Sequence, residues 1–213
     1  MIGMTLPKNY IVWDLETTGF DPIKDYIIEI GVAMVRDGEI VERKNWLLNH
    51  GIEITEKTTE VTGITKELID SEGRDPAECL SEFMQILQVD TPHLTHNGIR
   101  FDIPFLVHAL IKHFGESQGG VMSYTKKIKT YRKYAMDTAV FVKAKKLGME
   151  WKWGEDFARY AERVMSIMAK RVKYSVDVCC EEMNISKEGV EQHRALGDVE
   201  LTNKIYQYLT QQS

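Results

Sequence analysis

The stretch Tyr10-Ile11-Val12-Trp13-Asp14-Leu15-Glu16-Thr17-Thr18-Gly19 decides the fold of this chain. β-Branched and aromatic residues fill its first half and a Thr-Thr-Gly turn ends it, a pattern that predicts a buried strand. Because side chains alternate along a strand, Asp14 and Glu16 project from one face and Leu15 from the other. Two carboxylates this close, beside an apolar strand, either share a proton or hold a cation, and a hard divalent ion is the simplest solution. On these two residues alone, a solvated strand end that keeps an edge soluble is an equal alternative.

Length and composition favour one domain over residues 1–213. The chain has 213 residues, of which 43% are apolar, and no Pro-, Gly- or Ser-rich linker divides it. Residues 1–8 lack the apolar core of a signal peptide, and no apolar run approaches the length of a membrane span. The three cysteines, Cys79, Cys179 and Cys180, form no Cys-x-x-Cys pair and indicate neither a disulfide framework nor a zinc knuckle. We therefore expect a soluble, cytoplasmic protein that does not enter a membrane.

Charge is unevenly distributed along the chain. The formal net charge is −5, yet residues 121–174 hold 14 Lys and Arg against 5 Asp and Glu, a local charge of +9 that leaves −14 for the remainder. An acidic part that holds metal ions and a basic part that faces phosphates would reconcile these numbers with a nucleic-acid partner. Residues 124–134 interleave three tyrosines with five cations. This mixture suits single-stranded nucleic acid, although most charge runs are only solvated surface.

Hydrophobic periodicity and turn residues predict the remaining elements. Strands are expected at 26–35, 40–48, 93–96 and 135–137, and helices at 65–71, 76–89, 102–113, 138–146, 155–173, 175–183 and 190–209. Turns at Phe20-Asp21-Pro22 and Asp37-Gly38 make the first three strands an antiparallel meander, so we expect an α/β domain with a mixed five-stranded sheet flanked by helices. Asp102 is well placed to cap the helix at 102–113, a structural role that competes with a functional one.

Three motifs give the chain a resemblance to a known family. They are Asp14-Leu15-Glu16-Thr17-Thr18-Gly19, His96-Asn97-Gly98-Ile99-Arg100-Phe101-Asp102 and His193-Arg194-Ala195-Leu196-Gly197-Asp198. With them the chain resembles the DEDDh branch of the 3′→5′ exonucleases, the group that includes the proofreading subunit of bacterial replicative DNA polymerase. The resemblance spans residues 10–209 and implies a ribonuclease H-like fold. Two features depart from it: Thr62 stands where many relatives have His in Val-His-Gly-Ile-Thr, and a helical insertion occupies residues 148–174.

The resemblance also implies a two-metal site for phosphodiester hydrolysis. The ions would be Mg²⁺ or Mn²⁺, which oxygen ligands select over zinc, about 3.5–4 Å apart. The implied metal ligands are Asp14, which bridges both ions, Glu16 and Asp198 beside the attacking water, and Asp102 at the second ion. His193 would be the general base. It lies five residues before Asp198, so the two face one cleft only if the last helix starts near His193; taken alone, His193 is a surface histidine.

The expected substrate is the 3′ end of a single strand, with DNA favoured. By the same resemblance Leu15, Thr17 and Thr18 cradle the terminal nucleotide, while Asn97 and Phe101 shape the second motif. The products would be nucleoside 5′-monophosphates, in DNA replication, repair or proofreading. An exoribonuclease and a non-catalytic, polymerase-associated binding module are the alternatives. A DNA polymerase is a candidate partner, and both a monomer and a homodimer fit the sequence. The helix expected at 155–173, with Lys170, Arg171 and Lys173, would flank the cleft and grip the strand.

Overall fold

A mixed five-stranded sheet occupies the centre of the protein. The computed structural model describes residues 7–87, 91–115, 135–152, 154–191 and 193–211. The strands are β1 (Tyr10–Thr17), β2 (Ile27–Arg36), β3 (Glu39–Leu47), β4 (His93–Thr95) and β5 (Ala135–Asp137). They are ordered β3-β2-β1-β4-β5, with β1, β2 and β3 antiparallel to one another in turn, β4 parallel to β1, and β5 parallel to β4. The expected mixed sheet is therefore confirmed.

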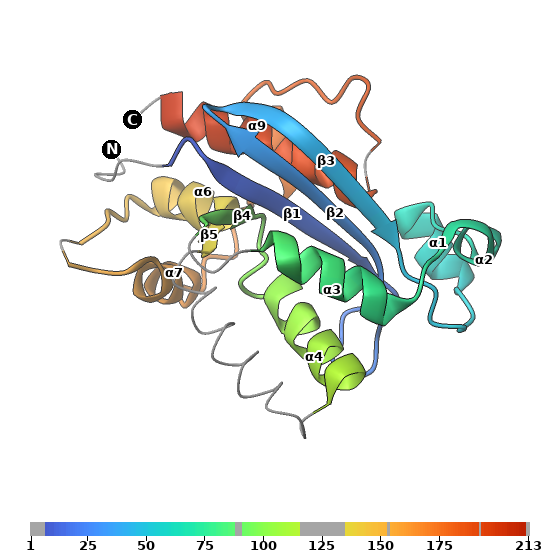
Figure 1. Ribbon diagram of the computed structural model, residues 1–213. Helices are drawn as coiled ribbons and strands as arrows, with labels where there is room; N and C mark the ends of the chain where they lie inside the picture. The colour runs from blue at the N-terminus through green and yellow to red at the C-terminus, as the bar shows by residue number, and fades with distance from the viewer. Residues whose placement is uncertain (1–6, 88–90, 116–134, 153, 192, 212–213) are drawn as a thin grey trace.

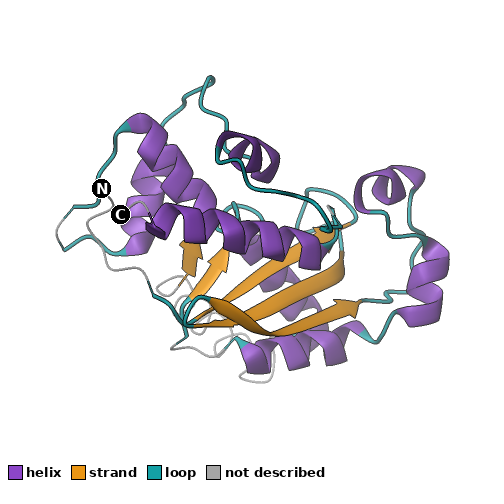
Figure 2. Ribbon diagram, turned by 90° about the horizontal axis from the view of Figure 1, so that it is seen from above, coloured by secondary structure: helices purple, strands orange, loops and turns teal. Residues whose placement is uncertain are grey.

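Helices cover both faces of this sheet. They are α1 (Glu56–Thr62), α2 (Lys66–Glu72), α3 (Pro76–Ile86), α4 (Asp102–Phe114), α6 (Thr138–Leu147), α7 (Phe157–Met165), α8 (Val176–Glu182) and α9 (Ala195–Gln211). Figure 1 shows α3 and α4 on one face and α9 on the other, and Figure 2 shows the sheet between these layers. The helices α1 and α2 lie beyond the end of β3, and α6 and α7 lie near β5.

Alternation along β1 divides the hydrophobic core in two. The core on the α9 side includes Tyr10 and Val12, and the core on the side of α3 and α4 includes Ile11, Trp13 and Leu15. Because side chains alternate with a period of two residues, Asp14 and Glu16 continue the row that faces α9. The sheet therefore directs both carboxylates toward the helix that carries the third motif.

The segment between β3 and α3 contains a helix that we did not expect. Helix α1 begins after Thr55, whose side chain accepts a hydrogen bond from the Thr58 N–H, and the expected helix α2 follows with Thr65 as its cap. Thr62 is buried, and its Oγ1 donates to the carbonyl of Thr58 and accepts from the Ile64 N–H. In this chain Thr62 thus has a structural role at the end of α1.

The expected helix over 155–173 is wrong in its second half. Helix α7 begins after its cap Asp156 and ends at Met165. The buried Lys143 explains this end, because its Nζ donates to the carbonyls of Met165 at 3.3 Å and Ile167 at 2.8 Å. A cation that takes the last carbonyls of a helix also interacts favourably with the helix dipole. Lys170, Arg171 and Lys173 consequently lie in an exposed loop after α7.

The last helix also starts later than expected, at Ala195 rather than near 190. Gly189 and His193 have positive φ angles of 75° and 57°, and these left-handed conformations do not continue a right-handed helix. The other expected helices at 76–89, 102–113, 138–146 and 175–183 are confirmed, with ends that differ by up to three residues.

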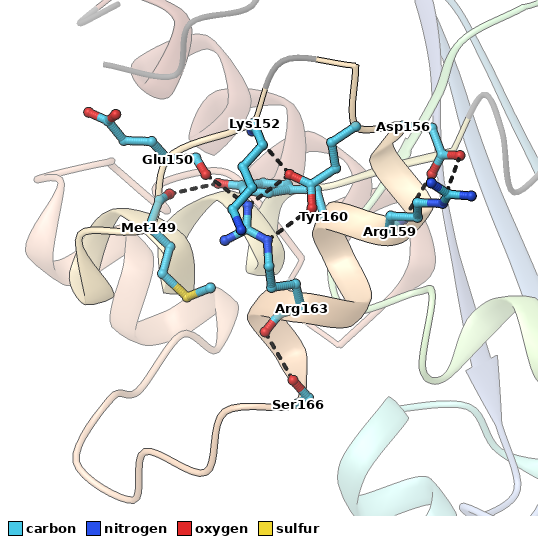
Figure 3. Close-up of polar contacts among 9 residues, drawn as sticks. Met149, Glu150, Lys152, Asp156, Arg159, Tyr160, Arg163 and Ser166 are labelled. Atoms are coloured by element: carbon cyan, nitrogen blue, oxygen red, sulfur yellow. Dashed lines mark hydrogen bonds and ion pairs between the residues drawn. The ribbon is translucent and has the colours of Figure 1, made fainter.

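Hydrogen bonds from α7 tie the first residues of the insertion to this helix (Figure 3). Arg163 Nε and Nη2 donate to Glu155, and Nη2 also donates to the Glu150 carbonyl at 2.8 Å. The Tyr160 hydroxyl donates to the Met149 carbonyl at 3.1 Å. Arg163 is therefore neutralised within the insertion and is not an exposed cation.

The structure also describes the three cysteines and the lengths of the helices. Cys79, Cys179 and Cys180 are buried free thiols. Across the described residues, every helix is too short or too polar to cross a membrane. The basic and tyrosine-rich run at 124–134 lies outside the described residues.

Candidate metal centre and substrate pocket

Three carboxylates from opposite ends of the chain meet at the end of β1. Asp14 and Glu16 come from β1 and Asp198 from the first turn of α9. Each offers a carboxylate oxygen, and these oxygens lie within 4.8 Å of one another. The structure thus brings together three of the four carboxylates expected to hold metal.

The fourth carboxylate, Asp102, lies next to this group. It is the first residue of α4 and is buried, and its Oδ1 accepts a hydrogen bond from the Leu15 N–H at 3.1 Å. The N-cap position belongs to Phe101, which makes no capping hydrogen bond through its side chain. The Asp102 side chain therefore binds the backbone of β1 and does not cap α4, so the capping alternative is wrong. Its charge also acts on Asp14, where it favours the protonated form.

Burial raises the pKa values of all four carboxyls, and the charges of nearby carboxylates add to the rise. Burial is the first cause of the rise at Asp14, whose pKa lies well above its ordinary value, and the charges of Asp102, Asp198 and Glu16 follow. Burial together with Asp198 raises the pKa of Glu16 to about 8. Burial likewise raises the pKa of Asp102 to about 7 and that of Asp198 to about 6. Such a cluster is stabilised in its ionised form by a cation.

The donor set fits a hard divalent ion. The grouped donors are carboxylate oxygens without histidine or cysteine. Mg²⁺ and Mn²⁺ prefer oxygen donors, whereas zinc favours nitrogen and sulfur. The chemistry of the residues present therefore agrees with the ions expected from the sequence.

His193 stands at the entrance to α9. Its side chain is exposed, its φ angle is +57°, and it precedes the first helical residue by two positions. The positive form of its ring lowers the pKa of the Asp198 carboxyl, against the larger rise that burial causes. The helix does start near His193, so the condition set by the five-residue spacing is met.

A pocket of about 240 Å³ adjoins the carboxylates. It is lined by Leu15, Glu16, Thr17, Thr18, Gly19, Phe20, Thr55, Lys57, Thr58, Val61, Thr62 and Phe101. Four of the five residues expected to contact or shape the substrate site are in this lining, and Asn97 is not. Phe20, which the sequence placed in a turn, is 83% exposed, and its ring packs edge-on against Phe101 with centroids 6.1 Å apart. An exposed ring, Phe20, and a partly buried one, Phe101, therefore lie together at the pocket.

Asp137 holds the turn of the second motif. This fully buried residue accepts hydrogen bonds from the backbone N–H groups of Asn97 at 2.8 Å and Ile99 at 3.2 Å, and it caps α6 at Ala139. Asn97 itself has a positive φ of 62°, so it is the turn residue. Burial raises the pKa of Asp137 to about 6. The sequence signal for this role of Asp137 was a carboxylate between the short strand β5 and the helix α6.

His96, the first residue of the second motif, binds the insertion. Its Nδ1 lies 2.7 Å from the Thr138 hydroxyl and its Nε2 lies 2.7 Å from the Tyr174 carbonyl. Burial lowers the pKa of His96 to about 4, so the ring is neutral. Because a carbonyl only accepts, the proton is on Nε2 and Nδ1 accepts from Thr138. The end of the insertion is therefore tied to the second motif.

Sequence reasoning missed Glu29 and Arg194. Glu29 on β2 lies opposite Glu16 on β1 and is 1% exposed. Arg194, within the third motif, forms an ion pair with it, with Nη2 and Oε1 2.6 Å apart. The charge of Glu29 also contributes to the raised pKa values of Asp14 and Glu16. An acid inside an otherwise apolar strand was the available signal.

A family model described as exonuclease matches residues 11–146. Similar proteins include the PolC-type DNA polymerase III of Thermotoga maritima, 35% identical over 145 residues, and that of Clostridium perfringens, 36% identical over 98 residues. The two matches cover 66% and 46% of this chain but only 10% and 7% of the relatives. The chain therefore spans about a tenth or less of the length of these relatives.

Among solved structures, exonuclease I resembles this fold. One structure of it has a TM-score of 0.68 at 15% identity, and the match covers 96% of this chain and 41% of that chain. Escherichia coli exonuclease I in complex with a dA16 oligonucleotide has a TM-score of 0.67 at 15% identity, with the same coverage of 96% and 41%. At this identity the likeness concerns the fold alone, and the expected ribonuclease H-like fold is confirmed.

The raised pKa values predict how stability depends on pH. A carboxyl whose pKa is higher in the folded than in the unfolded state contributes stability that is lost as pH rises through the folded value. Glu16 and Asp102, at about 8 and 7 against ordinary values of 4.5 and 3.8, set this window. In EDTA, the free energy of unfolding should fall by about 1 kcal/mol or more between about pH 7 and 8.5, where unfolded histidines are already neutral. Urea denaturation at each pH measures this free energy.

Divalent ions should reverse this loss, because a cation binds the ionised carboxylates. The gain in unfolding free energy with Mn²⁺ is expected to be larger at the higher pH. Glu16→Gln is the control and should flatten the dependence. A metal-free protein that becomes more stable over the same interval would contradict the arrangement of charges described here.

Proposed function

The chain belongs to the exonuclease family, within its DEDDh branch, and on that premise we propose that residues 1–213 form one exonuclease domain that degrades a single strand from its 3′ end. DNA is the favoured substrate, and nucleoside 5′-monophosphates are the products. One observation carries this proposal. The carboxylates of Asp14, Glu16 and Asp198, with oxygens within 4.8 Å of one another, adjoin a pocket of about 240 Å³ that is large enough to admit part of a nucleotide.

The carboxylates would bind the metal ions that this reaction requires. Asp14, Glu16 and Asp198 are the proposed ligands of a pair of divalent cations, with Asp102 as a further ligand beside them. Bound cations would supply Lewis-acid activation of water and would stabilise the charge on the leaving oxygen. The raised pKa values of these carboxyls support the assignment, because they indicate a cluster that is unfavourable without a counter-charge.

His193 would accept the proton of the attacking water. Its ring is exposed and is therefore within reach of solvent, and its charge acts on the Asp198 carboxyl. This interaction supports a position of the histidine near a proposed metal ligand. A histidine at the entrance to a helix meets the geometric demand on a general base more easily than one inside the helix, because its side chain is less restricted by neighbouring turns.

The pocket favours an unpaired terminal nucleotide. Leu15, Thr17, Thr18 and Phe101 would hold it, and the exposed ring of Phe20 offers a surface on which a base can stack. Two comparisons support DNA as the substrate. E. coli exonuclease I forms a complex with single-stranded DNA, and the PolC-type relatives are DNA polymerases. Proofreading beside a polymerase is therefore the proposed context.

The loop after α7 is the proposed grip on the strand. Lys170, Arg171 and Lys173 are exposed. Two hydrogen bonds anchor the end of the loop. The Lys173 carbonyl accepts from Lys146 Nζ at 2.6 Å, and the Tyr174 carbonyl accepts from His96. These contacts tie the end of the loop to α6 and to the second motif.

Labelled oligonucleotides test the direction and the substrate. With Mn²⁺ or Mg²⁺, a 3′-labelled DNA strand should release its label as a mononucleotide at once, whereas a 5′-labelled strand should give a ladder that shortens with time. EDTA should stop both reactions. Matched RNA should be degraded more slowly. Faster cleavage of RNA would identify an exoribonuclease, and binding without cleavage in any of these mixtures would identify a non-catalytic module.

Two substitutions separate the proposed roles of histidine and carboxylate. His193→Ala should lower kcat by about 10² to 10⁴ while Mn²⁺ binding is retained, because only proton transfer is lost. Asp14→Ala should lose both activity and Mn²⁺ binding. Steady-state kinetics and titration calorimetry measure the two properties, and His108→Ala on α4 is the control. Equal losses of metal binding in the two variants would refute this division of roles between His193 and Asp14.

Neutralising the loop should change the salt dependence of binding. In the triple variant Lys170→Gln, Arg171→Gln and Lys173→Gln, the slope of log affinity against log salt should decrease by up to about 2, since each phosphate contact on a single strand contributes about 0.7. Fluorescence anisotropy of a labelled oligonucleotide in EDTA measures this slope. Lys44→Gln on the edge strand β3 is the control and should leave it unchanged. An unaltered slope in the triple variant would remove the loop from the binding surface.

A further inference from the structure

Glu29 is a buried carboxylate in an otherwise apolar strand. It is 1% exposed, whereas its neighbours Ile28 and Ile30 are fully buried apolar residues. A charge in such a position is unfavourable unless hydrogen bonds and an opposite charge compensate it. Glu29 also lies opposite Glu16 in the pairing of β1 and β2, next to the proposed metal ligands. The position therefore calls for a specific compensating partner.

The partners of Glu29 are hydrogen-bond donors at the start of α9 and on β3. Arg194 Nε donates to both of its oxygens at 3.1 Å, and Arg194 Nη2 donates to Oε1 at 2.6 Å. The Ala195 N–H donates to Oε2 at 2.9 Å, and Asn45 Nδ2 donates to Oε1 at 2.8 Å. Both oxygens are thus used by donors, and Glu29 is not one of the three grouped carboxylates. Its contacts are those of an anchor for the start of α9.

This anchor lies immediately after His193. Arg194 is the next residue, Ala195 is the first residue of α9, and the body of α9 is held separately by its apolar face in the core. The backbones are also in close contact there, because a Cβ on Gly31 would lie 2.5 Å from the Ala195 carbonyl carbon. His193, outside the helix and in a left-handed conformation, directly precedes the two residues that Glu29 binds.

We propose that Glu29 is a positioning residue for the nuclease reaction: through Arg194 and the Ala195 N–H it holds His193 in place beside Asp198. The proposal rests on the exonuclease function proposed above. Glu29 acts through another residue and touches neither substrate nor metal. Arrangements of this kind, in which a buried group orients a catalytic side chain, typically change activity 10- to 100-fold when they are lost.

A double-mutant cycle tests the proposal. Glu29→Gln keeps the shape of the side chain but removes its charge, and kcat on a single-stranded DNA substrate should fall by about 10- to 100-fold. In the His193→Ala background the same substitution should lower kcat less than about threefold, because a ring that is absent cannot be misplaced. An undiminished loss in that background would overturn the proposal, since Glu29 would then act independently of His193.

A second substitution covers the case in which Glu29→Gln does not fold. Arg194→Lys keeps the charge but loses the two-pronged geometry of the guanidinium, so it should retain the melting temperature and lower kcat in the same His193-dependent way. Mn²⁺ affinity should stay within about threefold of wild type in both variants, and a larger loss would make Glu29 a metal ligand instead.

The control is another ion pair between α9 and the sheet. Glu200 Oε1 accepts from Arg43 Nε at 2.8 Å on the exposed side of the helix, and Glu200→Gln should leave kcat unchanged. A comparable loss of kcat in this variant would mean that any weakened contact of α9 lowers activity, which would overturn the specific role of Glu29. If wild type does not cleave DNA, the proposed function fails; if wild type cleaves and Glu29→Gln cleaves equally well, only the positioning role fails.

Discussion

Electrostatic repulsion among carboxylates at the end of β1 is the constraint on which the rest of the structure depends. Leu15 is buried against α3 and α4, so the alternation of the strand forces Asp14 and Glu16 to the opposite face, where the first turn of α9 supplies Asp198. Burial in this position raises the pKa values of all three carboxyls. Two apolar cores thus hold together charges that would separate in water, and a counter-charge at this point favours the folded arrangement.

Buried polar residues around this centre position the segments that carry it. Glu29 binds the start of α9, Asp137 holds the turn of the second motif, and His96 ties that motif to the end of the insertion. Each of them satisfies backbone groups that are not paired within a helix or strand, which is the main task of a buried polar side chain. The geometry of the centre therefore depends on contacts made several residues away from the proposed ligands.

Local pattern was sufficient to predict the sheet and most helices, because strand alternation and helical periodicity act over a few residues. The convergence of the motifs was expected from the family resemblance. Local pattern did not predict the end of α7, which Lys143 determines from another helix, or the start of α9, which follows the left-handed His193. Glu29 was missed for the same reason, since its partner Arg194 is 165 positions away in the chain. The cap remained an alternative for Asp102 because its bond to the Leu15 N–H is equally remote in sequence.

Anomalous scattering from Mn²⁺ in crystals grown with a single-stranded oligonucleotide is the measurement that tests the central claim most directly. If the carboxylates form the proposed centre, the anomalous difference map should contain two peaks bonded to oxygens of Asp14, Glu16 and Asp198, with Asp14 between them and the 3′ end of the strand in the adjoining pocket. A map with no peak at these residues, or with the strand bound on another face of the sheet, would contradict it.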